Sequence, residues 1–231
     1  MTDHTSSPWH RATAGLLLVL ATLWAYLVWN APIDRVQGVV QKILYVHPPT
    51  AFAMYLGFVL TGVGGALYLW RGDARYDRFA ASSAEVGVLF AVLMLLSGPI
   101  WAKGTWGKWW SWDLRLTLTL VQFMVYVAYL LLRSFTEGSE RAARFAAVYG
   151  IIGVVLIPLN YFAIDLAAGR SIHPENLGEG SLGEGMRAPF WAGVATALAA
   201  FGYLLVRRVE VGALRAECAH REAHAALGAE Q

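Results

Sequence analysis

Six long apolar segments constrain the fold of this sequence more than any other feature. They cover residues 13–30, 49–70, 80–101, 115–133, 145–166 and 189–207, and short polar or charged stretches separate them. A bilayer core about 30 Å thick needs roughly 20 apolar residues in each helix that crosses it, and all of these segments are close to that length. The pattern therefore predicts an all-α polytopic membrane protein with six transmembrane helices.

Composition supports this prediction and excludes several other classes of protein. The chain of 231 residues is 57% hydrophobic and only 15% charged, which is too little polar surface for a soluble domain of this length. A net charge of +2 gives no basic surface for nucleic acid. The single cysteine, Cys218, excludes an intrachain disulfide and a CxxC pair. We expect residues 1–231 to form a single six-helix membrane domain, with the first segment as an uncleaved anchor.

Lys and Arg residues in the connections predict the orientation of the chain. They are more frequent before the first segment and after the second, fourth and sixth segments than in the other connections. This modest excess places both termini in the cytoplasm. The connections 31–48, 102–114 and 167–188 then lie on the outer face of the membrane, and residues 208–231 form a cytoplasmic, largely helical extension.

Tryptophans cluster in the second outer connection, at Trp106, Trp109, Trp110 and Trp112. Tryptophan is enriched where lipid meets water, so an aromatic belt is one interpretation. The indole ring is also a wide, stiff surface with one N–H donor, which suits a planar apolar ligand. Composition alone does not decide between a belt and a binding platform.

The spacing of this cluster favours a platform if residues 106–113 are helical. Three of the tryptophans and Asp113 then share one helix face and form a flat aromatic surface along the membrane. Lys108 and Arg115 are close in sequence and suit carboxylates on a ligand. Asp113 also has a structural interpretation, which we favour, as the N-cap of the helix that begins near residue 114.

His47 and His173 lie in the first and third outer connections, on the same side as the tryptophans. Each precedes a proline, so we expect an extended backbone at both. Pro48 and Pro49 suit the first turn of the second membrane helix, which would hold His47 at its mouth. A lone histidine at a membrane edge is usually a hydrogen-bonded surface residue. Two neutral imidazoles beside an aromatic surface instead favour axial ligation of haem iron, and their separation along the chain excludes a local zinc motif.

The run Trp-Gly-Lys-Trp-Trp-Ser-Trp-Asp at 106–113, followed by Leu-Arg-Leu-Thr at 114–117, resembles the WWD signature of haem-handling membrane proteins. Chain length, six segments and one histidine in each flanking outer connection make the chain most similar to the CcmC family, the haem exporter protein C of bacterial cytochrome c maturation. Pro48 is a minor departure from the family pattern, which has valine there.

The resemblance implies a cargo, a set of site residues and a set of partners. It implies that haem b is bound with His47 and His173 as axial iron ligands. It further implies that the haem contacts a segment made of Trp106, Trp109, Trp110, Trp112, Asp113 and Arg115. The chain would be a non-enzymatic subunit in the bacterial inner membrane that delivers haem to the periplasmic chaperone CcmE. Its other partners would be the ABC-transporter subunits CcmA and CcmB and the small membrane protein CcmD.

Two alternatives come from other classes of protein. A cytochrome c haem lyase of the CcmF or CcsA type shares the WWD signature, but such lyases are usually longer and their motif continues Trp-Asp-Pro-Lys-Glu. Here the motif continues Trp-Asp-Leu-Arg-Leu. A permease or purely structural subunit with an aromatic belt is the other alternative, and it predicts a colourless purified protein.

Overall fold

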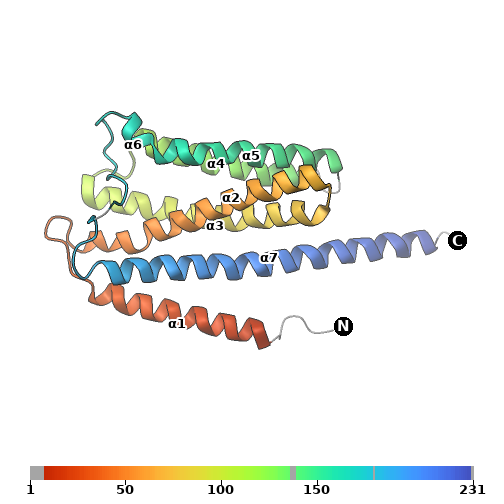
Figure 1. The fold of residues 1–231 in the computed structure, drawn as a ribbon, viewed down its shortest axis with the longest axis horizontal. Helices are drawn as coiled ribbons and strands as arrows, with labels where there is room; N and C mark the ends of the chain where they lie inside the picture. Colours follow the sequence, from red (N-terminus) through yellow and green to blue (C-terminus); the bar gives the residue numbers. More distant parts are fainter. Residues whose placement is uncertain (1–7, 136–138, 179, 230–231) are drawn as a thin grey trace.

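The computed structural model describes residues 8–135, 139–178 and 180–229, and it is all-helical (Figure 1). Within these residues, six helices are long and apolar enough to cross a membrane, which confirms the predicted fold class. They are α1 (Pro8–Asn30), α2 (His47–Arg71), α3 (Ala74–Trp106), α4 (Leu114–Phe135), α5 (Glu140–Tyr161) and α7 (Arg187–Ala229). A 3₁₀ helix, η2 (Val39–Tyr45), and a short helix, α6 (Ala163–Leu166), lie in the connections.

The helices form a bundle in which α2, α3, α4 and α5 pack on one another and α7 lies along α2 and α3 (Figure 1). α1 packs on α7 and buries none of its residues within the chain, which suits an apolar helix surrounded by lipid. The connections α1–α2, α3–α4 and α6–α7 gather at one end, which we call the histidine end because it carries His47 and His173. α1 begins and α7 ends at the opposite end, where α7 runs past the other helices (Figure 1). The extension predicted over 208–231 is therefore helical as far as Ala229, and residues 230–231 lie outside the described residues.

The core of the bundle depends on a close contact between α2 and α3. A Cβ atom built on Gly57 would lie 2.6 Å from the Cα atom of Gly87, so the two backbones touch at this point. Small residues allow this approach, which supports helix association where lipid removes most of the hydrophobic driving force. Next to this contact, the rings of Phe58 and Tyr126 stack with centroids 3.7 Å apart and planes inclined by 2°.

Buried polar groups connect α2, α4 and α5 on the side of the core nearest the histidine end. Asn160 of α5 is fully buried, and its Nδ2 donates to Thr119 Oγ1 of α4 over 2.8 Å. Its Oδ1 accepts a hydrogen bond of 3.0 Å from the hydroxyl of Tyr55 of α2. Hydrogen bonds between side chains of neighbouring helices are a common means of fixing their relative position in a membrane. This network therefore fixes the three helices that position the site.

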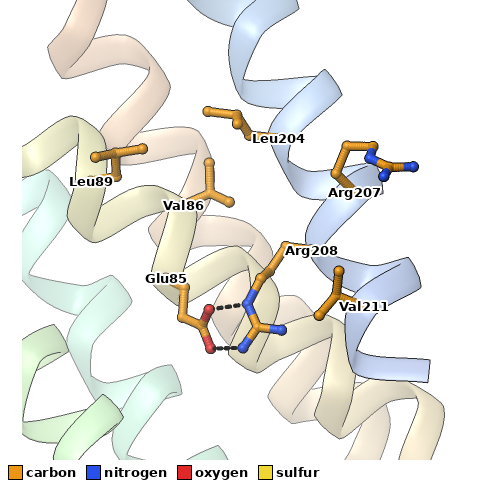
Figure 2. Close-up of a pocket in the computed structure, with 7 residues that line it drawn as sticks. All are labelled: Glu85, Val86, Leu89, Leu204, Arg207, Arg208 and Val211. Carbon is orange, nitrogen blue, oxygen red and sulfur yellow. Dashed lines mark hydrogen bonds and ion pairs between the residues drawn. The ribbon is translucent and has the colours of Figure 1, made fainter. Parts of the chain in front are cut away.

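An ion pair connects α3 to α7 toward the opposite end of the bundle. Glu85 lies within a predicted apolar segment, and the sequence suggests no role for it. In Figure 2 its carboxylate faces Arg208 of α7, and Arg208 Nη2 donates to Glu85 Oε1 over 2.7 Å. An ionisable group in a membrane helix is costly unless it is paired. Glu85 thus has a structural partner within the bundle.

Helix boundaries at the histidine end differ from those predicted. α3 continues to Trp106, and residues 107–113 form an irregular loop, so the helix suggested for 106–113 is wrong. Gly107 is the cause: with φ 72° and ψ 2° it adopts the left-handed conformation that ends helices, and its N–H bonds to the carbonyl of Lys103. The segment predicted over 145–166 is also divided, because α5 ends at Tyr161 and α6 follows as a separate turn.

Candidate functional site

His47 is the first residue of α2, and α3 holds its imidazole ring. The extended backbone predicted for His47 is wrong, because Pro48 and Pro49 form the first turn of α2 and the helix already includes His47. The prediction that Pro48 and Pro49 lie in the first turn of α2 and place His47 at its N-terminus is confirmed. Its Nδ1 atom lies 3.1 Å from Ser97 Oγ of α3. Trp101, one turn further along α3, packs edge-on with ring centroids 5.9 Å apart and planes at 77°.

His173 lies in the α6–α7 connection with its ring oriented by its own backbone. Its Nδ1 is 2.8 Å from the carbonyl oxygen of Pro174. A carbonyl oxygen can only accept, so Nδ1 carries the proton of the neutral ring and Nε2 keeps its lone pair. Burial lowers the pKa of His173 from its usual value of 6.5, and the positive charge of Arg115 lowers it further. The ring is therefore neutral at pH 7, and its Nε2 lone pair can bind a metal ion.

Asp113 caps α4, as predicted, and the same carboxylate binds the loop that carries His173. Its Oδ1 accepts from the backbone N–H of Arg115 over 2.9 Å, and its carbonyl accepts from Thr117 N–H over 2.9 Å. Its Oδ2 accepts from the N–H of Ile172 over 3.0 Å, one residue before His173. The second and third connections of the histidine end are thereby joined through one buried side chain.

Hydrogen bonds keep this carboxylate ionised although it is buried. Burial alone would raise the pKa of Asp113. Hydrogen bonds from the Ser171 hydroxyl and from the N–H groups of Arg115, Ile172 and Leu116 outweigh that effect and lower the pKa below 3.8. A carboxylate that accepts several such bonds is stabilised in its charged form. The hydrogen bonds by which Asp113 links the two connections thus persist through the neutral pH range.

His47 and His173 lie at the same end of the bundle although they are distant along the chain. His47 begins α2 beside Ser97 of α3, and Asp113 binds the residue before His173 to the start of α4, where Arg115 lies. The fold therefore brings two imidazoles and one guanidinium to the same end of the bundle.

The four tryptophans do not form the flat helical surface suggested from their spacing, because residues 107–113 are not helical. Trp106 ends α3 and is half-buried. Trp110 and Trp112 pack edge to face with ring centroids 6.0 Å apart, and Trp112 and Trp109 are 77% and 60% exposed. The indole N–H of Trp110 is buried without a hydrogen-bond partner among the described residues. The loop thus presents two exposed indoles on a chain segment that Asp113 ties to the His173 loop.

Among the cations predicted for ligand carboxylates, Arg115 has the most defined surroundings. It is half-buried, and its Nη1 donates to Asn176 Oδ1, while Asn176 Nδ2 donates to the carbonyl of Tyr161 over 3.1 Å. The other predicted cation, Lys108, is exposed, and so is Arg170 of the α6–α7 connection, whose Nε donates to the nearby Ala167 carbonyl over 3.3 Å. Of these three cations, Arg115 is therefore the one whose guanidinium a side chain of another described segment holds in place.

Sequence reasoning missed Ser97, Asn176 and Ser171, which contact the predicted site residues. Each is a single polar residue, either in a helix that reads as apolar or in a loop without regular pattern. Their partners come from distant parts of the chain. Only the fold reveals these pairs.

The two histidines suit a cofactor whose metal ion already has most of its coordination positions filled. Across the described ranges, no group of three or more His, Cys, Asp or Glu side chains is arranged to hold a metal ion by itself. Haem iron already has its porphyrin nitrogens and requires only axial ligands, for which neutral imidazoles are common. Two histidines are thus sufficient for haem, whereas a structural zinc site would need four ligands.

Fold and site together define a multi-span α-helical membrane protein with two histidines and a tryptophan-rich loop at one end. The family model described as haem exporter protein C, CcmC, matches residues 2–227, which is nearly the whole chain. The chain belongs to this family of haem exporter and cytochrome c biogenesis proteins.

Relatives from several organisms agree with the family match. The chain is 33% identical over 159 residues to haem exporter protein C of Bradyrhizobium diazoefficiens, which covers 68% of this chain and 59% of that protein. The haem exporter protein C of Paracoccus denitrificans is 31% identical over 68% of this chain and 64% of its own length. The corresponding protein of Rhodobacter capsulatus is 27% identical over 86% of this chain and 81% of its own. The match thus spans less than two thirds of the first two of these relatives.

Proposed function

We propose that this chain binds haem b at the outer face of the bacterial inner membrane and delivers it to the periplasmic haem chaperone CcmE. His47 and His173 would be the axial iron ligands. The observation that supports the proposal is the location of both imidazoles at the same end of the bundle, where a hydrogen-bond partner contacts Nδ1 of each ring. In both rings Nε2 is then left for iron.

The surrounding residues have distinct roles in this proposal. Asp113 holds the His173 loop against the start of α4. The exposed rings of Trp109 and Trp112 supply apolar area for the porphyrin. Arg115 supplies a fixed positive charge for a propionate, with which a guanidinium forms strong paired hydrogen bonds. The chain thus positions and releases haem, and we assign none of its side chains a covalent step.

Orientation and partners follow from the charge pattern and from the family. The Lys and Arg residues favour cytoplasmic termini, which puts the histidine end in the periplasm. We propose CcmA, CcmB and CcmD as partners, and residues 1–231 as a single membrane domain. The periplasmic location of the site is what makes transfer to a periplasmic chaperone sterically direct.

Transfer from purified protein tests the proposal. The chain is purified in detergent, loaded with haemin and incubated with apo-CcmE, and haem bound covalently to the chaperone is measured by haem staining after denaturing electrophoresis. We expect transfer by the wild type and by His220→Ala, since His220 is exposed in the C-terminal part of α7. We expect weak haem binding and little transfer by His47→Ala and His173→Ala.

Two results would contradict the proposal. One is wild-type transfer by both the His47→Ala and the His173→Ala variants, which would remove these residues from the site. The other is covalent attachment of haem to an apocytochrome in the absence of CcmE and other factors, which would favour a haem lyase.

A further inference from the structure

We infer that Ser97 is a positioning residue that holds the His47 imidazole in its Nδ1–H tautomer and so directs Nε2 toward haem iron. This inference rests on the proposed ligation of haem by His47. Ser97 lies in α3, outside the WWD signature and outside the loops that carry the other site residues.

The hydrogen bonds around Ser97 determine which ring nitrogen carries the proton. His47 Nδ1 lies 3.1 Å from Ser97 Oγ, and the Ser97 hydroxyl donates to the carbonyl of Met94 over 3.1 Å. A hydroxyl has one proton, so once it is donated to Met94 the oxygen offers only lone pairs to the ring. Ser97 Oγ therefore requires Nδ1 to be the donor, which leaves the lone pair on Nε2.

The shape of α3 at this point fixes the plane of the ring. Ser97, Gly98 and Trp101 face His47 from consecutive turns of the helix. A Cβ atom on Gly98 would lie 3.1 Å from His47 Cε1, so the absence of a side chain makes room for the imidazole. Trp101 closes the other side edge-on, and its Nε1 is held by Gln37 Oε1 over 2.8 Å. The ring is thus confined, and Ser97 supplies its polar contact.

A hydrogen bond of this kind affects metal binding in a measurable way. A ligating histidine that donates its other N–H is held in one orientation and becomes a stronger electron donor, and loss of such a partner typically weakens metal binding 10- to 100-fold. Since Gly98 and Trp101 still confine the ring after the hydroxyl is removed, we expect the lower end of this range, a loss of about 10-fold in haem affinity. A weaker donor also stabilises ferric iron less, so the midpoint potential of bound haem should move in the positive direction.

The experiment compares Ser97→Ala with Ser97→Thr, which keeps a hydroxyl, and with the control Ser82→Ala. Ser82 is buried in the same helix and bonds to the Arg78 carbonyl over 2.9 Å. ¹⁵N NMR of the haem-free protein reports the tautomer of His47, assigned with His47→Gln, and a haemin titration with redox potentiometry reports affinity and potential. We expect the Nδ1–H form in the wild type, in Ser97→Thr and in Ser82→Ala. Ser97→Ala should show a mixture of tautomers, about 10-fold weaker binding and a more positive potential.

The results separate failure of this inference from failure of the proposed function. An Nε2–H form of His47 in wild-type protein would overturn the inference without any variant. Wild-type tautomer, affinity and potential in Ser97→Ala would also overturn it, while haem ligation by His47 would stand. If instead His47→Gln binds haem with an unchanged spectrum, the ligation itself is wrong, and so is the role of Ser97 toward iron.

Discussion

The carboxylate of Asp113 serves two parts of the site, and one substitution separates them. Asp113→Asn keeps an oxygen that can cap α4 at the Arg115 N–H, because asparagine is a good N-cap. Its amide nitrogen cannot accept from the Ile172 N–H, which is now bound over 3.0 Å. We therefore expect α4 to remain capped while the loop that carries His173 is released.

The size of this effect follows from the bond that is lost. A hydrogen bond to a charged group contributes about 1.5–3 kcal/mol, and Asp113 is only 8% exposed, so solvent does little to reduce it. A loss of about 2 kcal/mol corresponds to roughly 30-fold in an equilibrium constant. Haem affinity should fall by up to that factor if the His173 loop must be ordered again on binding. Asp113→Ala should additionally lose the cap, which contributes about 1 kcal/mol to stability.

The assay is a haemin titration in detergent that follows the Soret band, combined with thermal unfolding. Asp73→Asn is the matched control, since Asp73 caps α3 in the same way, with Oδ1 accepting from Arg75 N–H over 2.8 Å, and lies outside the histidine end. We expect Asp73→Asn to bind haem like the wild type. Wild-type haem affinity in Asp113→Asn would refute the conclusion that this carboxylate holds the His173 loop.

Three further predictions concern pH, the polar network and helix packing. Only the neutral imidazole binds iron, and burial lowers the pKa of His173 below 6.5, so haem affinity should be full at pH 8 and should fall with a midpoint below pH 6.5. A midpoint at or above pH 6.5 in a spectroscopic titration would contradict this. Asn160→Leu removes three hydrogen bonds, each worth about 0.6 kcal/mol in a membrane. Unfolding in denaturing detergent should therefore show a free energy of unfolding lowered by about 2 kcal/mol. An unchanged free energy of unfolding would count against the network. Gly57→Ala should destabilise the folded protein by about 1–3 kcal/mol, because its Cβ would lie 2.6 Å from Gly87 Cα. The control Gly202→Ala should leave stability unchanged, because its Cβ would have nothing within 4 Å. Equal melting temperatures for the two variants would argue against the close contact.

The fold was predictable from the sequence because lipid permits few solutions. A chain that crosses a bilayer must satisfy its backbone internally, so each long apolar segment becomes a helix. The positions of all six spans follow from this rule, with errors at their ends. Those errors have local causes, of which the clearest is the left-handed Gly107 that stops α3 and prevents a helix over 106–113.

The site was predictable only where the neighbouring residues in the sequence indicate the structural role of a residue. Asp113 precedes an apolar helix and reads as an N-cap, and Pro48 and Pro49 mark the start of α2, although they do not reveal that His47 already belongs to it. Contacts between segments that are distant along the chain leave no such signal in the local sequence. The second bond of Asp113, to Ile172, joins residues far apart in sequence, and so does the bond between His47 and Ser97.

The measurement that tests the central claim most directly is low-temperature electron paramagnetic resonance of the purified chain loaded with ferric haem. Two imidazoles on one iron predict a low-spin signal in the wild type, and replacement of either His47 or His173 by alanine should convert it to a high-spin signal. A high-spin wild-type signal, or a low-spin signal that survives both replacements, would contradict the claim that these two histidines meet on a single haem.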